Sequence, residues 1–242
     1  MVATDNTGNK ILEVIADANR FNSWMYETIR PFLQGNILEI GSGIGNISSF
    51  FLTDKITITL SDTDEFYIGK LKSQFISSPT LKGILMIDLQ HPSFEVTYSI
   101  LREQYDAIFL LNVLEHIEDD NAAIKNCNYL LKPGGTLLIL TPAYSFLYSS
   151  LDKALGHYRR YTSSLLNLLL QKNNLVLKKT FYFNALGIIA WFYGKILKLK
   201  TIPSTEMRLY NKIVPLARLI DKIIFRKAGL SVISVGEKTN SM

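Results

Sequence analysis

Residues 37–46 read Ile-Leu-Glu-Ile-Gly-Ser-Gly-Ile-Gly-Asn, and this stretch decides the fold. Residues 36–40 are mostly apolar and predict a short buried strand, and an amphipathic helix follows the glycines. Gly41, Gly43 and Gly45 stand at alternate positions between them, where a side chain would keep a ligand away from the backbone. Exposed N–H groups at the start of such a helix suit a polar or anionic ligand. The stretch therefore predicts a strand–turn–helix unit with a ligand at its turn.

The spacing of the glycines separates two classes of nucleotide-binding turn. In the dinucleotide fingerprint G-x-G-x-x-G a third glycine would stand at position 46, where this chain has Asn46. The chain instead has G-x-G-x-G, which resembles motif I of class I methyltransferases that depend on S-adenosyl-L-methionine (SAM). A strand–helix turn without a ligand is the alternative. In that family the turn holds the amino-acid end of the cofactor, which implies SAM contacts from Glu39, Gly41, Ser42, Gly43 and Gly45.

Length and composition fit a globular protein. The chain has 242 residues, of which 48% are hydrophobic and 19% charged, so it suits one large α/β domain or a core domain with an insertion. The first ten residues are polar and predict no signal peptide, and no apolar run reaches the roughly 18–20 residues that cross a bilayer. The single cysteine, Cys127, cannot form an internal disulfide. We therefore expect a cytoplasmic protein, with peripheral contact on the inner membrane face left open.

The net charge of +5 is unevenly distributed. Residues 185–229 contain nine Lys or Arg and two Asp or Glu, a net of +7, which leaves −2 for the rest of the chain. Apolar residues at helical spacing stand between these basic residues and predict basic amphipathic helices. Such helices can lie in a membrane interface, roof an active site or form a dimer face, and the sequence leaves all three open. Nucleic-acid binding is disfavoured because the segment is too apolar and no base-stacking motif accompanies it.

The end of the second predicted strand carries the expected ribose ligand. Residues 56–60 are rich in β-branched side chains and predict a strand that ends at Ser61-Asp62. A carboxylate at the tip of a second strand, about 20 residues beyond the glycines, can accept hydrogen bonds from both ribose hydroxyls. We therefore expect Asp62 to bind the ribose, with Thr63 beside it. A helix N-cap is the alternative role, and it fits Asp64 better because a predicted helix starts immediately after it.

Two further strand ends complete the cofactor site that the resemblance implies. The third predicted strand ends just before Asp88, and residues 105–111 form an apolar run typical of a central parallel strand. In the class I family the acid after strand three meets the adenine amino group and the next residue packs on the ring, which implies these roles for Asp88 and Leu89. A turn-forming role is the alternative for Asp88. The backbone after strand four borders the cofactor in the same family, which implies contacts from Asn112 and Val113.

Residues 114–117 read Leu-Glu-His-Ile and resemble the motif after strand four in small-molecule and quinone-type O-methyltransferases. In those families the Glu-His pair faces the methyl group that is transferred, which implies such a place for His116. Some quinone-type relatives carry a further Glu three residues before the pair, and it can contribute to a metal site. Asn112 stands there in this chain, so we predict no metal site. A hydrogen-bonded structural histidine is the alternative for His116.

The loop at 144–162 is the second distinctive stretch. Its pattern Leu-Asp…Gly-His-Tyr-Arg-Arg-Tyr resembles a bacterial methyltransferase group linked with glycosyltransferases and with polysaccharide or lipid-linked sugar assembly. We expect the loop over the strand ends, where open α/β sheets bind substrate. A neutral imidazole is available as a base near pH 7, so we expect His157, oriented by Asp152, to serve an acceptor hydroxyl, with His116 as second candidate. Arg159 would position a carboxylate acceptor, and the alternative is that the arginines and tyrosines lock the loop onto acidic helix ends.

These landmarks predict a Rossmann-like class I methyltransferase fold, an α/β sheet of seven mostly parallel strands with an antiparallel last strand. We expect the core to comprise residues 1–184 and 230–242, with 1–33 as an N-terminal helical cap. Residues 185–229 are predicted to form a helical insertion between strands six and seven that contacts substrate or membrane. Aromatic residues of the cap could form a lid or serve ordinary helix packing: Phe21, Trp24 and Tyr26.

The resemblance implies a transferase that uses SAM and releases S-adenosyl-L-homocysteine. We expect methyl transfer to a small-molecule or lipid-linked, glycan-type acceptor, with oxygen as the methylated atom. A soluble natural product or quinone-like metabolite is the alternative acceptor. An aminopropyltransferase of similar fold would need further acids near its amine site, and a non-catalytic binding protein would not need an intact set of cofactor residues. The oligomeric state, including a homodimer, is left open.

Overall fold

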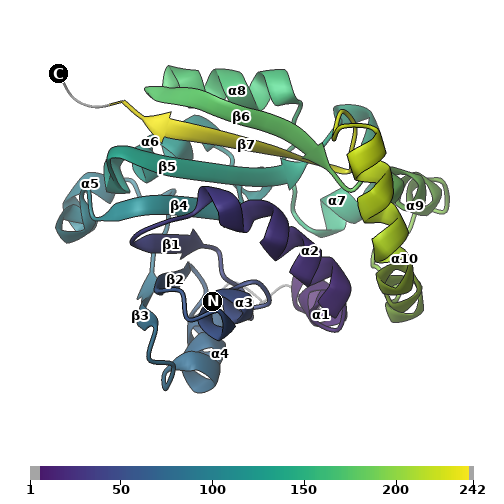
Figure 1. Cartoon of the computed structure of the whole chain (residues 1–242), viewed down its shortest axis with the longest axis horizontal. Helices are drawn as coiled ribbons and strands as arrows, with labels where there is room; N and C mark the ends of the chain where they lie inside the picture. Colours follow the sequence, from purple (N-terminus) through teal and green to yellow (C-terminus); the bar gives the residue numbers. More distant parts are fainter. Residues whose placement is uncertain (1–5, 240–242) are drawn as a thin grey trace.

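Seven strands form one sheet with helices on both faces (Figure 1). The computed structural model of the protein describes residues 6–239, so residues 1–5 and 240–242 of the predicted core segments lie outside it. The strands are β1 (Ile37–Ile40), β2 (Ile58–Asp62), β3 (Leu81–Met86), β4 (Tyr105–Leu111), β5 (Leu131–Pro142), β6 (Leu175–Phe183) and β7 (Ser231–Lys238). Their order across the sheet is β3-β2-β1-β4-β5-β7-β6.

The strand directions confirm the predicted fold class. β1 to β5 run parallel, and β7 runs antiparallel to both of its neighbours, β5 and β6. The carboxyl ends of the parallel strands therefore meet at one edge of the sheet, which we name the carboxyl edge (Figure 1). Phe183 at the end of β6 pairs with Ser231 at the start of β7. The chain thus leaves the sheet and returns to it at the carboxyl edge.

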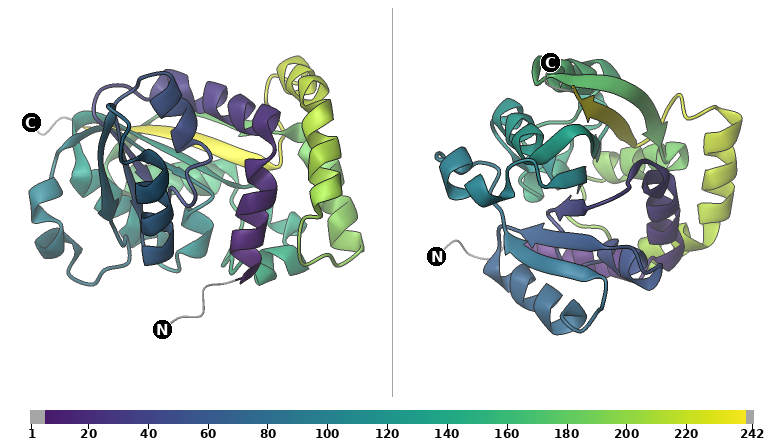
Figure 2. Two further views of the ribbon diagram at one scale, coloured as in Figure 1. Left: turned by 90° about the horizontal axis from the view of Figure 1, so that it is seen from below. Right: turned by 60° about the vertical axis from the view of Figure 1, so that its left-hand side comes forward.

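Helices cover both faces of the sheet and its carboxyl edge (Figure 2). On one face lie α2 (Asn19–Ile29), α3 (Ser48–Thr53), α4 (Glu65–Phe75) and α10 (Ser204–Ile223). On the other face lie α5 (Phe94–Thr97), α6 (Asp120–Leu130) and α8 (Ser163–Lys172). Toward the carboxyl edge lie α1 (Asn6–Ala16), α7 (Ser150–Ala154) and α9 (Ala185–Ile196). The structure also contains four short 3-10 helices within residues 6–239: η1 (Arg30–Phe32), η2 (Ser99–Leu101), η3 (Leu114–His116) and η4 (Ser145–Leu147).

The central strands are buried on both sides. Successive side chains of a strand point to opposite faces of a sheet. Phe109 and Leu138 belong to the core cluster under α2 and α10, whereas Ile108 and Leu137 belong to the cluster under α6 and α8. All four are fully buried. This double burial explains why β4 reads as a continuous apolar run, because both of its faces must avoid water.

β2 starts two residues later than the sequence predicts. It spans Ile58–Asp62, because the N–H of Ile56 donates to the carbonyl of Phe51 at 2.9 Å and so still belongs to the connection from α3. At its other end β2 includes Asp62, which pairs with Met86 of β3. The expected ribose ligand therefore stands on a rigid element and not in the following loop.

The aromatic residues of α2 pack in the core. The ring of Trp24 lies 4.3 Å from that of Phe183, between centroids, and Tyr26 stacks on Phe50 at 5.4 Å. Trp24 and Tyr26 are buried, and Phe21 is half-buried against the same Phe183. The structure thus shows ordinary helix packing for these residues, which corrects the suggestion of a lid.

α9 and α10 form a helical pair between β6 and β7. The buried carboxylate of Asp221 on α10 accepts the backbone N–H groups of Asn184 at 2.7 Å and Ala185 at 2.8 Å, at the start of α9. Arg218 of α10 also pairs with Glu27 of α2. α10 is therefore fixed to both neighbouring helices. Within residues 6–239, every helix is too short or too polar to span a bilayer.

Gly229 provides a test of how tightly this pair joins the sheet. A Cβ atom on Gly229 would lie 2.3 Å from the carbonyl oxygen of Phe183. We predict that Gly229→Ala lowers the free energy of unfolding by about 1–3 kcal/mol, because relieving the clash must move the backbone of β6. A thermal melt would show a decrease in Tm of roughly 2–4 °C per kcal/mol.

Gly69→Ala is the matched control for this substitution. Gly69 is exposed on α4, and among the described residues no atom outside its own helix backbone lies within 4 Å of the place that a Cβ atom would take. Alanine there should leave Tm unchanged or raise it, because alanine favours helix. Equal melting of both variants would contradict the close approach at Gly229.

Candidate functional site

The glycine turn is bonded to the tip of β2. Gly41, Gly43 and Gly45 have φ angles of 72°, 54° and 82°, the left-handed region that favours glycine. The N–H of Gly43 donates to Oδ2 of Asp62 at 2.9 Å, and Oδ1 of Asp62 accepts the N–H of Asp64 at 3.1 Å. Burial raises the pKa of Asp62, and these N–H groups oppose the increase. The turn after β1 and the end of β2 therefore form one fixed unit.

The two residues after Asp62 have different environments. Asp64 caps α4, since its Oδ1 accepts the N–H of Phe66 at 2.8 Å, as the sequence predicted. Thr63 lies between the two acids and is exposed at the carboxyl edge. Asp64 thus has the N-cap role, and the ribose-binding role of Asp62 stays a prediction.

Glu39 and Ser42 join the region of the glycine turn to α3 and β2. Glu39 is buried and accepts the hydroxyl of Ser48 at the start of α3. Burial raises the pKa of Glu39 to about 7. The N–H of Ser42 donates to the carbonyl of Ser61 at 2.8 Å. These contacts fix the backbone of the turn.

Val113 and Leu12 close the turn from two other sides. A Cβ atom on Gly41 would lie 2.4 Å from Cγ2 of Val113, and one on Gly43 would lie 3.3 Å from Cδ1 of Leu12. Asn46 also donates its Nδ2–H to the carbonyl of Leu12 at 3.2 Å. α1 is therefore the element that covers the turn. The sequence did not single out Leu12, because an apolar helix residue carries no signal of what it covers.

Asp88 forms a tight turn after β3. Its Oδ1 accepts the N–H of Gln90 at 2.8 Å, and its second carboxylate oxygen is not part of that turn. Leu89 is 3% exposed and lies in the core, where its carbonyl accepts Nδ2–H of Asn126 at 3.0 Å. The structure thus shows the turn-forming role of Asp88, and its contact with adenine stays a prediction, as does that of Leu89.

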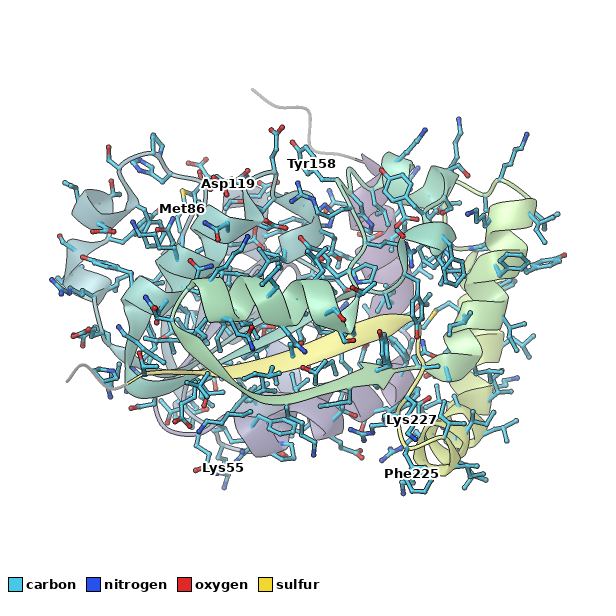
Figure 3. The ribbon with its side chains drawn as sticks, turned by 90° about the horizontal axis from the view of Figure 1, so that it is seen from above. Lys55, Met86, Asp119, Tyr158, Phe225 and Lys227 are labelled. Atoms are coloured by element: carbon cyan, nitrogen blue, oxygen red, sulfur yellow. The ribbon has the colours of Figure 1, made fainter. Side chains whose placement is uncertain are left out.

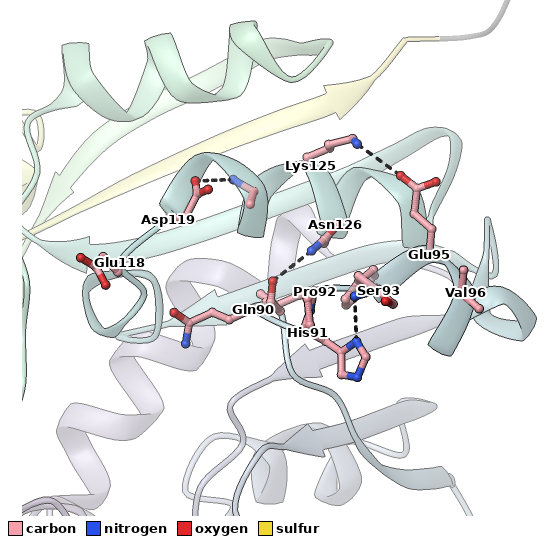
Figure 4. Close-up of a pocket in the computed structure, with 13 residues that line it drawn as sticks. Gln90, His91, Pro92, Ser93, Glu95, Val96, Glu118, Asp119, Lys125 and Asn126 are labelled. Atoms are coloured by element: carbon pink, nitrogen blue, oxygen red, sulfur yellow. Dashed lines mark hydrogen bonds and ion pairs between the residues drawn. The ribbon is translucent and has the colours of Figure 1, made fainter.

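A cleft of about 660 Å³ lies between the loop after β3 and the start of α6 (Figure 4). His91, Glu118 and Asp119 line it, and an ion pair of 3.3 Å between Lys125 and Glu95 joins α6 to α5 beside it. The glycine turn does not line this cleft. Leu89, which is expected to pack on the adenine, does line it, so the cleft borders the predicted adenine end of the site.

Asn112 marks the end of the central strand. Its φ of 54° places it in the left-handed region, which asparagine tolerates better than most residues. Its N–H donates to the carbonyl of Leu140 at 2.9 Å, and its side chain is exposed. Backbone in such a conformation often occurs at functional sites. Here it turns the chain from β4 into η3.

Glu115, His116 and His157 meet at the carboxyl edge. One ligand-forming atom from each of the three lies within 4.8 Å of the others. The two imidazole rings pack edge to face with centroids 4.6 Å apart. His116 is exposed, whereas His157 is 7% exposed and Glu115 is fully buried. Neither carboxylate oxygen of Glu115 has a hydrogen-bond partner among the described residues. The structure therefore brings together the two predicted histidines from separate segments.

Asp152 is the centre of the 144–162 loop. Its Oδ1 accepts from Nδ1 of His157 at 2.9 Å and from Nε of Arg160 at 2.8 Å, and its Oδ2 accepts the N–H and hydroxyl of Ser149. Burial acts to raise the pKa of Asp152, but the bonds from His157 and the charge of Arg160 hold this pKa below its ordinary value. An ionised carboxylate only accepts hydrogen bonds, so Nδ1 of His157 carries the proton. Asp152 thus fixes the ring of His157, and a role of His157 as a base stays a prediction.

Arg159 locks the loop onto α6. Its Nη1 donates to Oδ2 of Asp120 at 2.8 Å, and its Nη2 donates to the carbonyl of Glu118 at 2.6 Å. Tyr161 donates its hydroxyl to the same oxygen of Asp120 at 2.9 Å. For Arg159 the geometry therefore favours the loop-locking alternative over a role in positioning a carboxylate acceptor.

Arg160 faces the interior of the protein, whereas the sequence predicted its neighbour Arg159 as a site residue. It is 4% exposed, donates from Nη1 to the carbonyl of Ala143 at 3.1 Å, and its guanidinium lies 4.3 Å from the ring centroid of Trp191. Its Nη2 has no hydrogen-bond partner among residues 6–239. Adjacent residues of an extended segment point to opposite sides. The pair Arg-Arg therefore requires one residue inside and one outside, but it does not say which.

The Glu115–His116–His157 cluster also has the side chains that bind transition metals. However, burial raises the pKa of the Glu115 carboxyl, and the positive charge of Arg160 opposes this increase only in part. A metal ion bound by Glu115 would therefore have to displace a proton from it. The prediction of no metal site stays a prediction, and this cluster is the place in the described chain where it can be tested.

Glu115 should make stability depend on pH. Burial raises its pKa to about 8, although Arg160 opposes the increase. An unfolded glutamate has a pKa of about 4.3, so the folded protein keeps a proton that the unfolded chain releases, and stability falls as pH rises between these values. We predict that wild type loses on the order of 3 kcal/mol more than Glu115→Gln between pH 5 and pH 8.

Denaturant unfolding of both proteins at the two pH values measures this difference. Glu39, whose pKa is also raised, contributes equally to wild type and variant and cancels in the comparison. Identical pH dependence of the two proteins would contradict a protonated Glu115.

The sequence has recognisable relatives. The methyltransferase domain family matches residues 15–180. A ubiquinone biosynthesis O-methyltransferase of Dinoroseobacter shibae is 32% identical over 111 residues, which are 46% of this chain and 42% of that protein. The chain thus spans less than half the length of this curated relative.

Solved structures share the architecture at low identity. A SAM-dependent methyltransferase from Archaeoglobus fulgidus matches with a TM-score of 0.57 and 15% identity, over 90% of this chain and 94% of that chain. Phosphoethanolamine N-methyltransferase 2 of Haemonchus contortus, in complex with SAM, matches with a TM-score of 0.60 and 14% identity, over 91% and 52%. The family match and the sheet order agree. The chain therefore belongs to the methyltransferase domain family and has the class I fold of SAM-dependent methyltransferases.

Proposed function

We propose that the protein transfers the methyl group of SAM to an oxygen atom of a small-molecule or lipid-linked acceptor, with a glycan-type acceptor as first choice. One observation carries the proposal. The glycine turn, the carboxylate of Asp62 and the pair His116–His157 all lie at the carboxyl edge, on or beside neighbouring strands. A cofactor held by the first two would therefore lie next to a base.

The residues at this edge fit SAM. Gly41 and Gly43 carry no side chain, and their backbone would receive the amino-acid end of the cofactor. Asp62 accepts two N–H groups and has lone pairs left for the ribose hydroxyls. Asp88 would meet the adenine amino group, and the backbone at Asn112 would border the middle of the cofactor. Bound SAM supplies a methyl group on a sulfonium, which an acceptor nucleophile displaces to leave S-adenosyl-L-homocysteine.

The protein's own contribution is alignment and proton transfer. An acceptor oxygen must be held in line with the methyl group, in a site that excludes water. A base within about 3 Å of the acceptor hydroxyl takes its proton, which contributes roughly 10²–10⁴-fold in rate. A carboxylate acceptor would need no base.

We assign proton transfer to His116. Its side chain is exposed at the carboxyl edge, whereas His157 is 7% exposed and donates Nδ1–H to Asp152. This reverses the order of the two histidines that the sequence favoured. His157 then acts as a positioning residue, because its fixed ring packs edge to face on that of His116.

Two observations bear on the acceptor. Exposed apolar residues of α9 and α10 support a lipid-linked acceptor. The similarity to ubiquinone biosynthesis O-methyltransferases supports a quinone-like metabolite as the second candidate. We include in the proposal the division into a cofactor-binding core, 1–184 with 230–242, and an acceptor-side insertion, 185–229. We also include a cytoplasmic location with peripheral contact on the inner membrane face.

Asp62 tests the cofactor site. We predict that Asp62→Ala weakens binding of S-adenosyl-L-homocysteine about 10–100-fold in calorimetry, because hydrogen bonds to a charged carboxylate are lost. Asp64→Ala is the control, since Asp64 caps α4 and should cost about 1 kcal/mol of stability without weakening the ligand. Wild-type affinity in a folded Asp62→Ala protein would remove the ribose assignment.

The histidines test the proton transfer. We predict that His116→Ala lowers kcat roughly 10²–10⁴-fold with an acceptor hydroxyl and leaves affinity for S-adenosyl-L-homocysteine unchanged. His157→Ala should lower kcat less and shift the pH profile, because His116 remains but loses its support. His91→Ala, in the loop after β3, should have no effect. If His157→Ala abolished kcat and His116→Ala changed kcat little, His157 would be the base instead.

A further inference from the structure

The amphipathic stripe of α10 points away from the protein. Met207, Val214 and Ala217 are buried against the core. Five other apolar residues of α10 follow one another at intervals of four, three, three and four positions. This spacing places their side chains on one side of the helix. They face solvent, and each is at least 37% exposed: Leu209, Ile213, Leu216, Leu219 and Ile223.

α9 has a matching exposed stripe. Its inner side makes contacts with the rest of the protein, as the indole N–H of Trp191 donates to the carbonyl of Leu147 at 3.1 Å. Phe225 follows α10 and lies at the rim of the molecule with Lys227 (Figure 3). We name the exposed apolar residues of α9 and α10, with Phe225, the outer helical face. Its members on α9 and just after it are each at least 49% exposed: Ile189, Phe192, Tyr193, Ile196 and Leu197.

Basic side chains surround the outer helical face. Glu206 is the only exposed acid in 185–229, because Asp221 is buried and bonded to backbone N–H groups at the start of α9. The exposed cations of this segment are Lys198, Lys200, Arg208, Lys212, Lys222 and Lys227. The combination of exposed apolar side chains with a basic border is the pattern of helices that lie in a membrane interface.

A groove beside the outer helical face adds to this pattern. It has a volume of about 680 Å³ and lies between α2 and α10. Arg20 and Lys222 line it together with the apolar side chains of Phe50, Val214 and Leu219. A cationic groove with apolar walls suits an anionic headgroup and the start of its acyl chain.

We propose that the outer helical face docks on the surface of a membrane that contains anionic lipids, and that this places the carboxyl edge against the bilayer. The inference rests on the proposed function where it concerns a lipid-linked acceptor. A second copy of the chain fits the face less well, because a two-fold dimer would bring the two basic borders together. The helices in 185–229 are too short or too polar to cross the bilayer, so they lie in its interface.

Contacts join the outer helical face to the loop that carries His157. Lys195 of α9 donates to the carbonyl of Phe146, and the hydroxyl of Ser150 donates to the carbonyl of Leu199 at 2.9 Å. Trp191 lies against the guanidinium of Arg160, which is bonded to Asp152. The side chains of Trp191, Arg160 and Asp152 therefore connect α9 to His157.

Vesicle sedimentation tests the docking. The full chain should sediment with vesicles of phosphatidylcholine and phosphatidylglycerol, bind much less to phosphatidylcholine alone, and dissociate as salt screens the basic border. Leu209→Ser combined with Leu216→Ser should weaken vesicle binding on the order of tenfold or more, because two exposed leucines no longer enter the interface. Val96→Ser combined with Ile100→Ser is the matched control, since these residues are 78% and 84% exposed, and α5, which contains Val96, lies at the opposite end of the molecule from α9 and α10 (Figure 1).

The outcomes separate this inference from the proposed function. Failure of the wild-type protein to sediment with anionic vesicles, while it binds S-adenosyl-L-homocysteine, would overturn the docking and leave methyl transfer intact. Concentration-dependent dimers that the paired leucine substitutions abolish would assign the face to a second copy and would also overturn it. Vesicle binding without binding of S-adenosyl-L-homocysteine would support the docking and contradict the proposed cofactor site.

Discussion

The buried carboxylate of Asp152 holds together the loop that closes the carboxyl edge. A buried charge is costly unless it is paired and hydrogen-bonded. Asp152 meets this requirement with His157 and Arg160 on one oxygen and with Ser149 on the other. The loop therefore has one arrangement that satisfies the carboxylate. That arrangement fixes the ring of His157 and brings Arg160 against Trp191 of α9.

The two halves of the candidate site use different parts of the chain. The cofactor half consists of backbone at the glycine turn and of carboxylates at or just after strand ends. The acceptor half consists of side chains from η3, the 144–162 loop and α9. A hydrogen bond of 2.8 Å from the N–H of Tyr158 to the carbonyl of Glu115 joins the loop to η3. This division suits a protein whose cofactor is shared across its fold family and whose acceptor is specific to the individual protein.

Patterns that depend on local chemistry could be predicted from the sequence, whereas orientation could not. The apolar run of β4 and the cap at Asp64 follow from burial and from hydrogen bonding near the residues themselves. The choice between Arg159 and Arg160 depends on which side of an extended segment faces inward, and sequence does not record it. The stripe on α10 shows the same limit, since helical spacing defines a face but does not say whether protein or solvent lies against it.

The pairing of Phe183 with Ser231 has a consequence for how such proteins can diverge. Everything between these neighbours starts and finishes at one point of the sheet, so its length and content can change while the strands keep their register. The α9–α10 pair is in this sense an exchangeable attachment on a constant scaffold. A replacement would have to cover the same core residues that Val214 and Ala217 of α10 now cover, but the glycine turn and the tip of β2 lie outside the exchanged segment.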